Sequence, residues 1–368
     1  MRSKIYVPPL SDRMETGLQT KNEWLVKYYQ FRNYHKNPDC LKKEAQEFQA
    51  SMGKNSSELA NRFRGSFLGL AVGDALGTTL EFSERNKEET HREMTGKGPF
   101  NLKPGRWTDD TSMALCVAYS LFDQKCFSAD DQMELFCEWW ENGLFSSTGK
   151  CFDIGSTVSS ALMRFKETGE AFAGSSDEMS AGNGSLMRLA PTVLFFASDP
   201  GEAILQSGES SRTTHGNIQA IDACRYYAAL ILGAIYGVDK NELLSPQYAP
   251  IEEYWSYHPL CLKMQDVANG SFKEKSRLEI ESTGYVIHSL EAALWAFYNS
   301  DSFESGLIKA VNLGGDSDTI GAIYGQLAGA YYGELNIPFK WIKNLTSFHY
   351  FYYFSDEFAS YYSGRQVK

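Results

Sequence analysis

Two short acidic segments have the residue types and the spacing of a divalent-cation site. One is Thr108–Asp110, and the other is Asp316–Thr319, which follows the turn Gly314–Gly315. Carboxylates and hydroxyls are the hard oxygen ligands that Mg²⁺, Mn²⁺ and Ca²⁺ prefer. Each segment also precedes an apolar run with a helical pattern, and capping of that helix is the simpler interpretation of either segment taken alone. Two such segments, each with a threonine beside its acids, favour a site over two caps.

Other polar residues could complete such a site from elsewhere in the chain. Asp74 lies within a helical pattern, and Glu81, soon after it, is either a surface charge or a site residue. The loop Gly182–Ser185 offers free backbone N–H groups at the start of a helix, which is a natural seat for an anion or phosphate, although Gly-Asn turns are common in loops. His215 stands at the start of an apolar helix, where a cap or a surface residue is commoner than a catalyst.

The element that must position the second acidic segment carries an unusual set of glycines. Two segments have one glycine at every fourth residue: Gly65, Gly69, Gly73 and Gly77 in the first, and Gly321, Gly325, Gly329 and Gly333 in the second. A glycine inside a helix costs about 1 kcal/mol relative to alanine, and a spacing of four places all of them on one stripe. We therefore expect the two striped helices to lie against each other or against a shared neighbour, which would bring Asp74 towards the acids.

The rest of the chain reads as helices joined by loops. Strand signals are nearly absent, so we predict an all-α fold with a single compact many-helix domain over residues 61–368. Residues 238–280 are polar and irregular and read as an excursion with helical pieces. The predicted helices are 61–77, 113–122, 130–142, 156–168, 220–236 and 284–297, and one more begins after Thr319.

Composition excludes several classes of function. The formal charge of −11 and the pI near 5.2 argue against a nucleic-acid-binding surface. No apolar run is expected to span a bilayer, and the N-terminus lacks the apolar core of a secretory signal. The seven cysteines form no CxxC pair and no zinc spacing with histidines. We expect them to be reduced core residues in a cytoplasmic protein.

Residues 1–60 differ from the rest and form a predicted N-terminal extension. The segment is polar but holds a cluster of aromatic residues, with short helices expected at Asn22–Phe31 and Lys42–Ala50. Two interpretations are open. The extension packs on the main domain, or it is an arm that contacts another protein, since clustered exposed aromatics favour interfaces.

Six motifs in this order resemble the ADP-ribosylglycohydrolase family, whose founding type is the dinitrogenase reductase-activating glycohydrolase. The resemblance covers about residues 60–335, and the combination of WTDDT with GGDSDT makes it specific. The motifs are GSFLGLAVGDALGTTLEF (65–82), WTDDTSMAL (107–115), GNGSLMRLAP (182–191), TTHGN (213–217), GYVIHSLEAALWAF (284–297) and VNLGGDSDTIGAIYGQLAGAYYG (311–333).

The resemblance implies a metal-dependent hydrolase that removes ADP-ribose from modified proteins, with arginine as the expected acceptor. It implies two Mg²⁺ or Mn²⁺ ions that orient the ribose and activate a water, with Asp109 or Asp316 as the base. The expected substrate contacts are Glu81, Asn183, Gly184, His215 and Tyr285. The expected metal ligands are Thr108, Asp109, Asp110, Asp316, Asp318 and Thr319.

Two features depart from the family pattern. Gly216 stands where many relatives carry proline, and residues 1–60 precede the shared domain. Some relatives are immunity proteins against ADP-ribosylating toxins, so the extension could dock onto an ADP-ribosyltransferase toxin and block it. A third interpretation is a catalytically dead member, which the presence of every metal-type residue argues against.

Overall fold

The computed structural model describes residues 58–85, 88 and 90–366. The predictions for residues 1–57, including the helices at 22–31 and 42–50 and the partner-binding arm, lie outside the described residues. Within the described residues the predicted all-α fold is confirmed, and β structure is limited to isolated bridges such as Ser175 with His215 and Gly182 with Tyr285.

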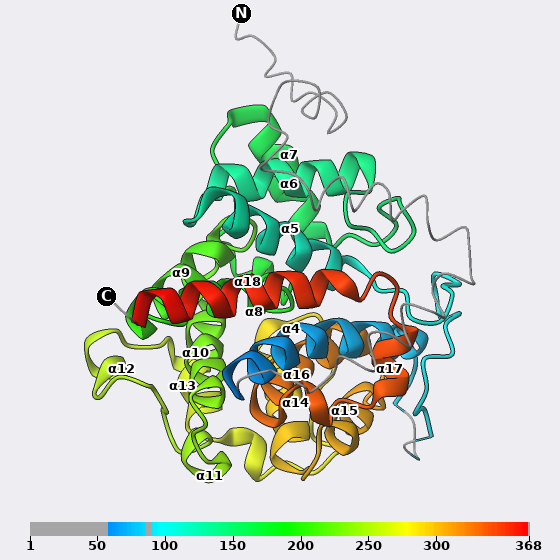
Figure 1. The fold of residues 1–368 in the computed structure, drawn as a ribbon, viewed down its shortest axis with the longest axis vertical. Helices are drawn as coiled ribbons and strands as arrows, with labels where there is room; N and C mark the ends of the chain where they lie inside the picture. The colour runs from blue at the N-terminus through cyan, green and yellow to red at the C-terminus, as the bar shows by residue number, and fades with distance from the viewer. Residues whose placement is uncertain (1–57, 86–87, 89, 367–368) are drawn as a thin grey trace, which may run out of the picture. The chain divides into compact units, whose positions relative to one another are not determined.

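The helices follow one another along the chain (Figure 1), and the longest connections lie between α4 and α5, between α7 and α8 and between α13 and α14. They are α4 (Glu58–Gly77), α5 (Asp109–Gln124), α6 (Ala129–Asn142), α7 (Ser156–Thr168), α8 (Ala190–Phe196), α9 (Pro200–Arg212), α10 (Ile218–Ile235), α11 (Lys240–Leu243), α12 (Tyr254–Tyr257), α13 (Leu262–Ala268), α14 (Val286–Tyr298), α15 (Phe303–Val311), α16 (Ser317–Tyr332), α17 (Phe339–Asn344) and α18 (His349–Gln366).

The predicted contact between the two glycine-striped helices is confirmed. Helices α4 and α16 run antiparallel, and a Cβ on Gly73 would collide with the carbonyl oxygen of Gly321. The same holds for Gly69 against Gly325. Hence the two backbones touch, and the C-terminal end of α4 meets the N-terminal end of α16. This contact places Asp74 beside the acids at the start of α16.

Some helices lie outside the predicted set. Helix α9 begins at Pro200 and is capped by Asp199, whose side chain accepts a hydrogen bond from the Glu202 N–H at 3.1 Å. That Asp-Pro start is a recognisable helix signal. Helix α18 is rich in aromatic residues without a clear period, and it lies alongside α4 (Figure 1). There the Phe351 ring packs edge-on against Phe67, at 5.1 Å between centroids.

Helix α10 corrects one expectation about apolar runs. By length and composition it could cross a membrane, but 78% of it is buried inside the fold, as in the core helix of a globular domain. The expectation of core cysteines holds only in part. Cys116 and Cys224 are buried, whereas Cys126 is exposed and the other described cysteines are partly exposed.

Candidate active site

Asp74 holds the first acidic segment in place. Its carboxylate accepts hydrogen bonds from the backbone N–H groups of Thr108 and Thr111 and from both of their hydroxyls, at 2.6–3.1 Å. Asp74 therefore satisfies two N–H groups at the start of α5, those of Thr108 and Thr111, from a neighbouring helix. Thr108 occupies the N-cap position of α5, yet its own side chain makes no capping bond. The capping interpretation of this segment is wrong for Thr108, because Asp74 does the capping.

The hydroxyl of Thr108 lies among three carboxylates. It is 3.0 Å from Asp74 Oδ1, 3.1 Å from Asp110 Oδ2 and 3.3 Å from Asp318 Oδ2. Each of the three acids offers one oxygen within 4.8 Å of the others, which is the geometry of a possible cation site. The two acidic segments thus meet at one point, although Thr108 and Asp318 are 210 positions apart in the sequence.

A second group of acids shares Asp318 with the first. Glu81, Asp153 and Asp318 also offer oxygens within 4.8 Å of one another. Sequence reasoning missed Asp153, which lies in the loop before α7 and has no acidic neighbour or motif to mark it. Glu81 is 8% exposed, so the interpretation of a surface charge is wrong. Its predicted contact with substrate stays a prediction.

The donor set fits a hard divalent cation. All of its atoms are oxygens, and among the described residues Asp110 Oδ1 and Glu81 Oε2 are buried without a hydrogen-bond partner. Burial raises the pKa of Glu81 to about 9, and the negative charges of Asp153 and Asp316 contribute to that rise. Burial and neighbouring acids also raise the pKa values of Asp110 and Asp318 well above the ordinary range. Acids crowded in this way need either protons or a cation to neutralise them.

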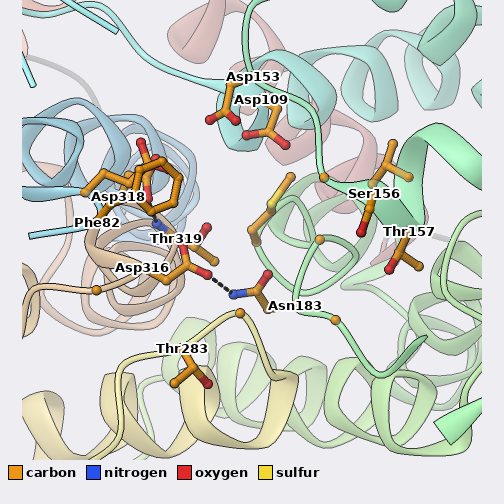
Figure 2. A pocket seen from close by; sticks show the side chains of 18 of the residues that line it. Phe82, Asp109, Asp153, Ser156, Thr157, Asn183, Thr283, Asp316, Asp318 and Thr319 are labelled. Carbon is orange, nitrogen blue, oxygen red and sulfur yellow. Dashed lines mark hydrogen bonds between the residues drawn. The ribbon is translucent and has the colours of Figure 1, made fainter. Parts of the chain in front are cut away.

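The acids line one part of a cavity of about 450 Å³. Figure 2 shows Asp318 and Phe82 on one side of it, with Ser156 and Thr157 across from them. This volume is within the usual range of small-molecule sites. Of the predicted site residues, the lining includes Glu81, Asp109, Asn183, Gly184, His215, Asp316, Asp318 and Thr319. Thr108 and Asp110 are buried and are not part of the lining.

Asp109 and Asp153 form an acidic pair on the cavity wall (Figure 2). Burial, helped by the charges of Asp74 and Asp316, raises the pKa of Asp153 to about 6, and a hydrogen bond with Asp109 acts in the opposite direction. Burial, Asp153 and Asp110 raise the pKa of Asp109 well above the ordinary range. Two carboxyl groups in contact hold one proton between them most readily, so this pair can keep a proton that isolated carboxyl groups would have lost.

Asp316 is oriented by Asn183. The Asn183 Nδ2 group donates to Asp316 Oδ2 at 2.8 Å (Figure 2). It also donates to Ser289 Oγ at 2.8 Å. Asp316 is the N-cap residue of α16 but makes no capping bond there. Thr319, which follows, donates its backbone N–H to Asp318 Oδ1 at 2.9 Å. Both acids of this segment therefore turn towards the cavity.

The anion seat predicted at Gly182–Ser185 is wrong in one respect, because this loop continues as turns and α8 begins only at Ala190. The Asn183 N–H is already bonded to Gly284 O at 3.1 Å. The helix start that does line the cavity is that of α7, through Gly155, Ser156 and Thr157. The first N–H groups of a helix have no partner within it and carry the positive end of its dipole.

His215 supports the glycine loop from below. A Cβ on Gly184 would lie 2.9 Å from His215 Cε1, so only glycine fits above the ring. His215 is 2% exposed, and its Nδ1 is 2.8 Å from the Thr214 hydroxyl. Burial lowers the pKa of His215 to about 3. The surface or capping interpretation is therefore wrong, and the ring is neutral. Gly216 is also required here, because a Cβ would collide with Gly174 O.

A buried cation ties the same two loops together. The Arg188 guanidinium donates to Gly184 O at 2.9 Å and to the hydroxyls of Thr213 and Thr214 at 3.2 and 2.8 Å. It is 1% exposed, and no carboxylate in the described part of the chain pairs with it. It lies instead over the Phe136 ring at 4.5 Å. A positive charge thus stands directly behind the glycine loop.

Tyr285 is the one predicted substrate contact that does not line the cavity. Its hydroxyl donates to Gln219 Oε1, and its side chain lines a neighbouring hollow of about 520 Å³. The adjacent residues Thr283 and Gly284 line the main cavity instead. The structure thus brings the backbone of this segment to the site, and a ribose contact of the Tyr285 ring stays a prediction.

Comparisons with known proteins relate the chain to a single enzyme family. The sequence profile described as ADP-ribosylglycohydrolase matches residues 55–366. The chain is 40% identical to the ADP-ribosylarginine hydrolase Tri1 of Pseudomonas putida (strain GB-1), over 78% of this chain and 74% of that protein. It is 36% identical to the ADP-ribosylarginine hydrolase Tri1 of Serratia proteamaculans (strain 568), over 92% and 84%. A solved structure titled ADP-ribosylglycohydrolase-related protein complex matches with a TM-score of 0.71 and 41% identity, over 83% of this chain and 98% of that one.

Proposed function

This chain belongs to the ADP-ribosylglycohydrolase family, and we propose that it is a metal-dependent hydrolase that cleaves the N-glycosidic bond between ADP-ribose and a protein side chain. We propose arginine as the acceptor, and the names of the two Tri1 relatives support this. The observation that carries the proposal is the cavity, which has cation-type acids at one part and the start of α7 at another. That arrangement fits a ligand with a ribose joined to a diphosphate.

Two divalent cations, Mg²⁺ or Mn²⁺, would be held by the two groups of acids that have Asp318 in common. One position would use Thr108, Asp110 and Asp318, and the other would use Asp318 with Glu81 and Asp153. When bound, such ions supply positive charge that orients the ribose hydroxyls and lowers the pKa of a water. Asp74 is close to the first position, but both of its oxygens already accept hydrogen bonds. We assign it the positioning of Thr108.

The proton is handled by the carboxylates of this chain. The oxygen of a water bonds to C1″ of the ribose, the C1″–N bond breaks, and the proton of the water passes to the departing guanidine nitrogen. Asp109 or Asp316 would relay that proton. Asp109 is hydrogen-bonded to Asp153, whose pKa is raised to about 6 by burial and by neighbouring acids. Asn183 holds Asp316 in one orientation.

The remaining contacts would bind the rest of the substrate. The free N–H groups at the start of α7 would bind the diphosphate, with the positive charge of Arg188 behind the opposite loop. The neutral His215 ring would keep the glycine loop in place beneath the ribose.

The test is release of ADP-ribose from a protein modified on arginine, with the same protein modified on serine as a comparison. We expect release from the arginine substrate with Mg²⁺ or Mn²⁺ and none with chelator. The variants Asp109→Asn and Asp316→Asn should lose turnover while keeping a melting temperature close to that of the wild type. Release by the wild type no faster than by these variants would refute the hydrolase proposal.

A second role is proposed for residues 1–60, namely binding to an ADP-ribosyltransferase toxin. The alignment with the Serratia relative covers 92% of this chain, which is more than residues 55–366. The similarity to that relative therefore extends beyond the shared domain. The test is a pull-down of a transferase toxin with the full chain and with a chain lacking residues 1–60. Equal capture and equal inhibition by both chains would rule this role out.

A further inference from the structure

Phe82 is a large apolar side chain that is held open to solvent at the cavity. It is 72% exposed and belongs to the cavity lining. Burial of a phenylalanine is normally favourable, so an exposed ring beside a polar site calls for a reason.

The backbone at Phe82 is fixed in a conformation that side chains rarely adopt. Its φ angle is +58°, in the left-handed region, which is sterically unfavourable for a bulky residue. Two hydrogen bonds lock it there: the Phe82 N–H donates to Gly315 O at 2.7 Å, and the Gly315 N–H donates to Ser83 O at 2.9 Å. Phe82 is therefore attached rigidly to the loop that carries Asp316. Backbone strain that surrounding structure maintains is often associated with function.

Phe82 belongs to an aromatic rim that we define as Phe82, Phe100 and Phe152. The Phe82 ring meets the edge of Phe100 at 6.4 Å between centroids, and Phe100 meets Phe152 at 5.3 Å. Two of the three residues are next in sequence to acids of the candidate cation site, because Phe82 follows Glu81 and Phe152 precedes Asp153. The rim thus borders the acidic part of the cavity.

The position of the rim relates it to one end of the substrate. In Figure 2 Phe82 stands across the cavity from Ser156 and Thr157, at the start of α7. If a diphosphate is bound at α7, the adenosine would lie on the side of the diphosphate that faces away from Phe82. The ribose carbon that reacts would lie at the acids, and the group attached to that carbon would extend past them.

We propose that Phe82 determines acceptor specificity by placing its ring against the guanidinium group of the modified arginine. This assignment rests on the proposed function and concerns the leaving-group side of the same reaction. A guanidinium cation is attracted to the face of an aromatic ring, and planar delocalised charge stacks there better than an ammonium group does. A neutral acceptor such as a serine oxygen gains no such contact.

The test measures binding in an Asp109→Asn background, where the substrate is expected to bind without turnover. Three ligands are compared: an ADP-ribosyl-arginine peptide, the matching ADP-ribosyl-serine peptide, and ADP-ribose. Phe82→Leu keeps an apolar side chain but removes the ring, and Phe82→Tyr keeps the ring. The matched control is Tyr257→Leu, which alters a side chain that is 75% exposed and lies outside the cavity lining.

We expect Phe82→Leu to weaken binding of the arginine peptide about three- to five-fold, as loss of an exposed cation–π contact would. In Phe82→Leu, binding of the serine peptide and of ADP-ribose should be unchanged. Phe82→Tyr should bind the arginine peptide as tightly as the parent, and Tyr257→Leu should not change the binding of any ligand. An equal loss for all three ligands would show that the ring contacts ADP-ribose instead, and no loss for any of them would remove Phe82 from recognition. Either result overturns the inference. Failure of the proposed function shows separately, as absent turnover by the wild type.

Discussion

Asp74 accepts hydrogen bonds from both the backbone N–H and the hydroxyl of Thr108, at 3.0 Å each. The acid lies at the end of α4 and the threonine at the start of α5, so one carboxylate joins the glycine-packed helix pair to the first acidic segment. Thr108 in turn points its oxygen at Asp110 and Asp318. The geometry of the candidate cation site therefore depends on a residue that the predicted ligand set does not contain.

Replacement of Asp74 by alanine should damage both stability and activity. Three buried donors, the N–H groups of Thr108 and Thr111 and the Thr111 hydroxyl, would lose their acceptor, and each buried donor left without a partner costs about 1–3 kcal/mol. Displacement of Thr108 and Asp110 should lower turnover by ~100-fold or more, as small misplacements in active sites do. Urea unfolding and ADP-ribose release measure the two effects. Asp130→Ala is the control, since Asp130 is an exposed acid in the first turn of α6. Similar behaviour of the two variants would contradict the assignment.

The contact between α4 and α16 predicts a severe effect of a single methyl group. In Gly73→Ala the new Cβ would meet the Gly321 carbonyl, which is backbone and cannot swing aside. We expect a loss of at least about 3 kcal/mol in the free energy of unfolding, at the upper end of overpacking effects. Gly364→Ala is the matched control, because Gly364 is an exposed position of α18 with no atom within 4 Å of the added Cβ. There alanine should be neutral or stabilising. A Gly73→Ala protein as stable as the control would disprove close backbone packing.

His215 should make stability depend on pH. Burial lowers its pKa from 6.5 to about 3 in the folded protein, so between these values the unfolded chain binds a proton that the folded chain does not. The contribution of the neutral ring to the free energy of unfolding is therefore fully present above pH 6.5. As the pH falls, the free energy of unfolding decreases, by about 2 kcal/mol between pH 7 and pH 5. Urea unfolding of the wild type and of His215→Gln, both with chelator, measures the difference. The difference in the free energy of unfolding between the two proteins should change over this pH range. A constant difference would mean that the ring is accessible to protons.

Asp318 should be the acid whose loss affects cation binding most, since it belongs to both groups of acids. Added Mn²⁺ should raise the melting temperature of the wild type, because a ligand that binds only the folded state stabilises it. In Asp318→Asn the apparent affinity for Mn²⁺ should fall by at least about 10-fold, more than for the loss of an outer contact. Thermal unfolding over a range of Mn²⁺ concentrations gives the affinities, and Asp130→Asn serves as the control. An unchanged affinity in Asp318→Asn would place the cations elsewhere.

Much of the site could be predicted because its residues carry local signals. The acids of both segments stand next to threonines and apolar helices, and the glycines repeat with a helical period, so short-range pattern is enough to find them. Asp153 carries no such signal, since it lies in an irregular loop between α6 and α7. Only its distance to Glu81 and Asp318 identifies it. The start of α7 is predictable as a helix boundary, but its place at the cavity depends on how α7 packs.

The sequence alone determined the all-α class, many helix positions and the presence of the two glycine stripes, because helical periodicity and the cost of glycine in a helix are local properties. That the two stripes pack directly on each other was decided by the tertiary structure. Only the tertiary structure decided what each polar residue does in the candidate site. Asp74 became a capping acceptor, His215 a neutral support beneath Gly184, and Glu81 a buried acid beside Asp318. These roles come from burial and from neighbours distant in the chain, and both the pKa of an acid and the partners of a hydroxyl are set by that surrounding space.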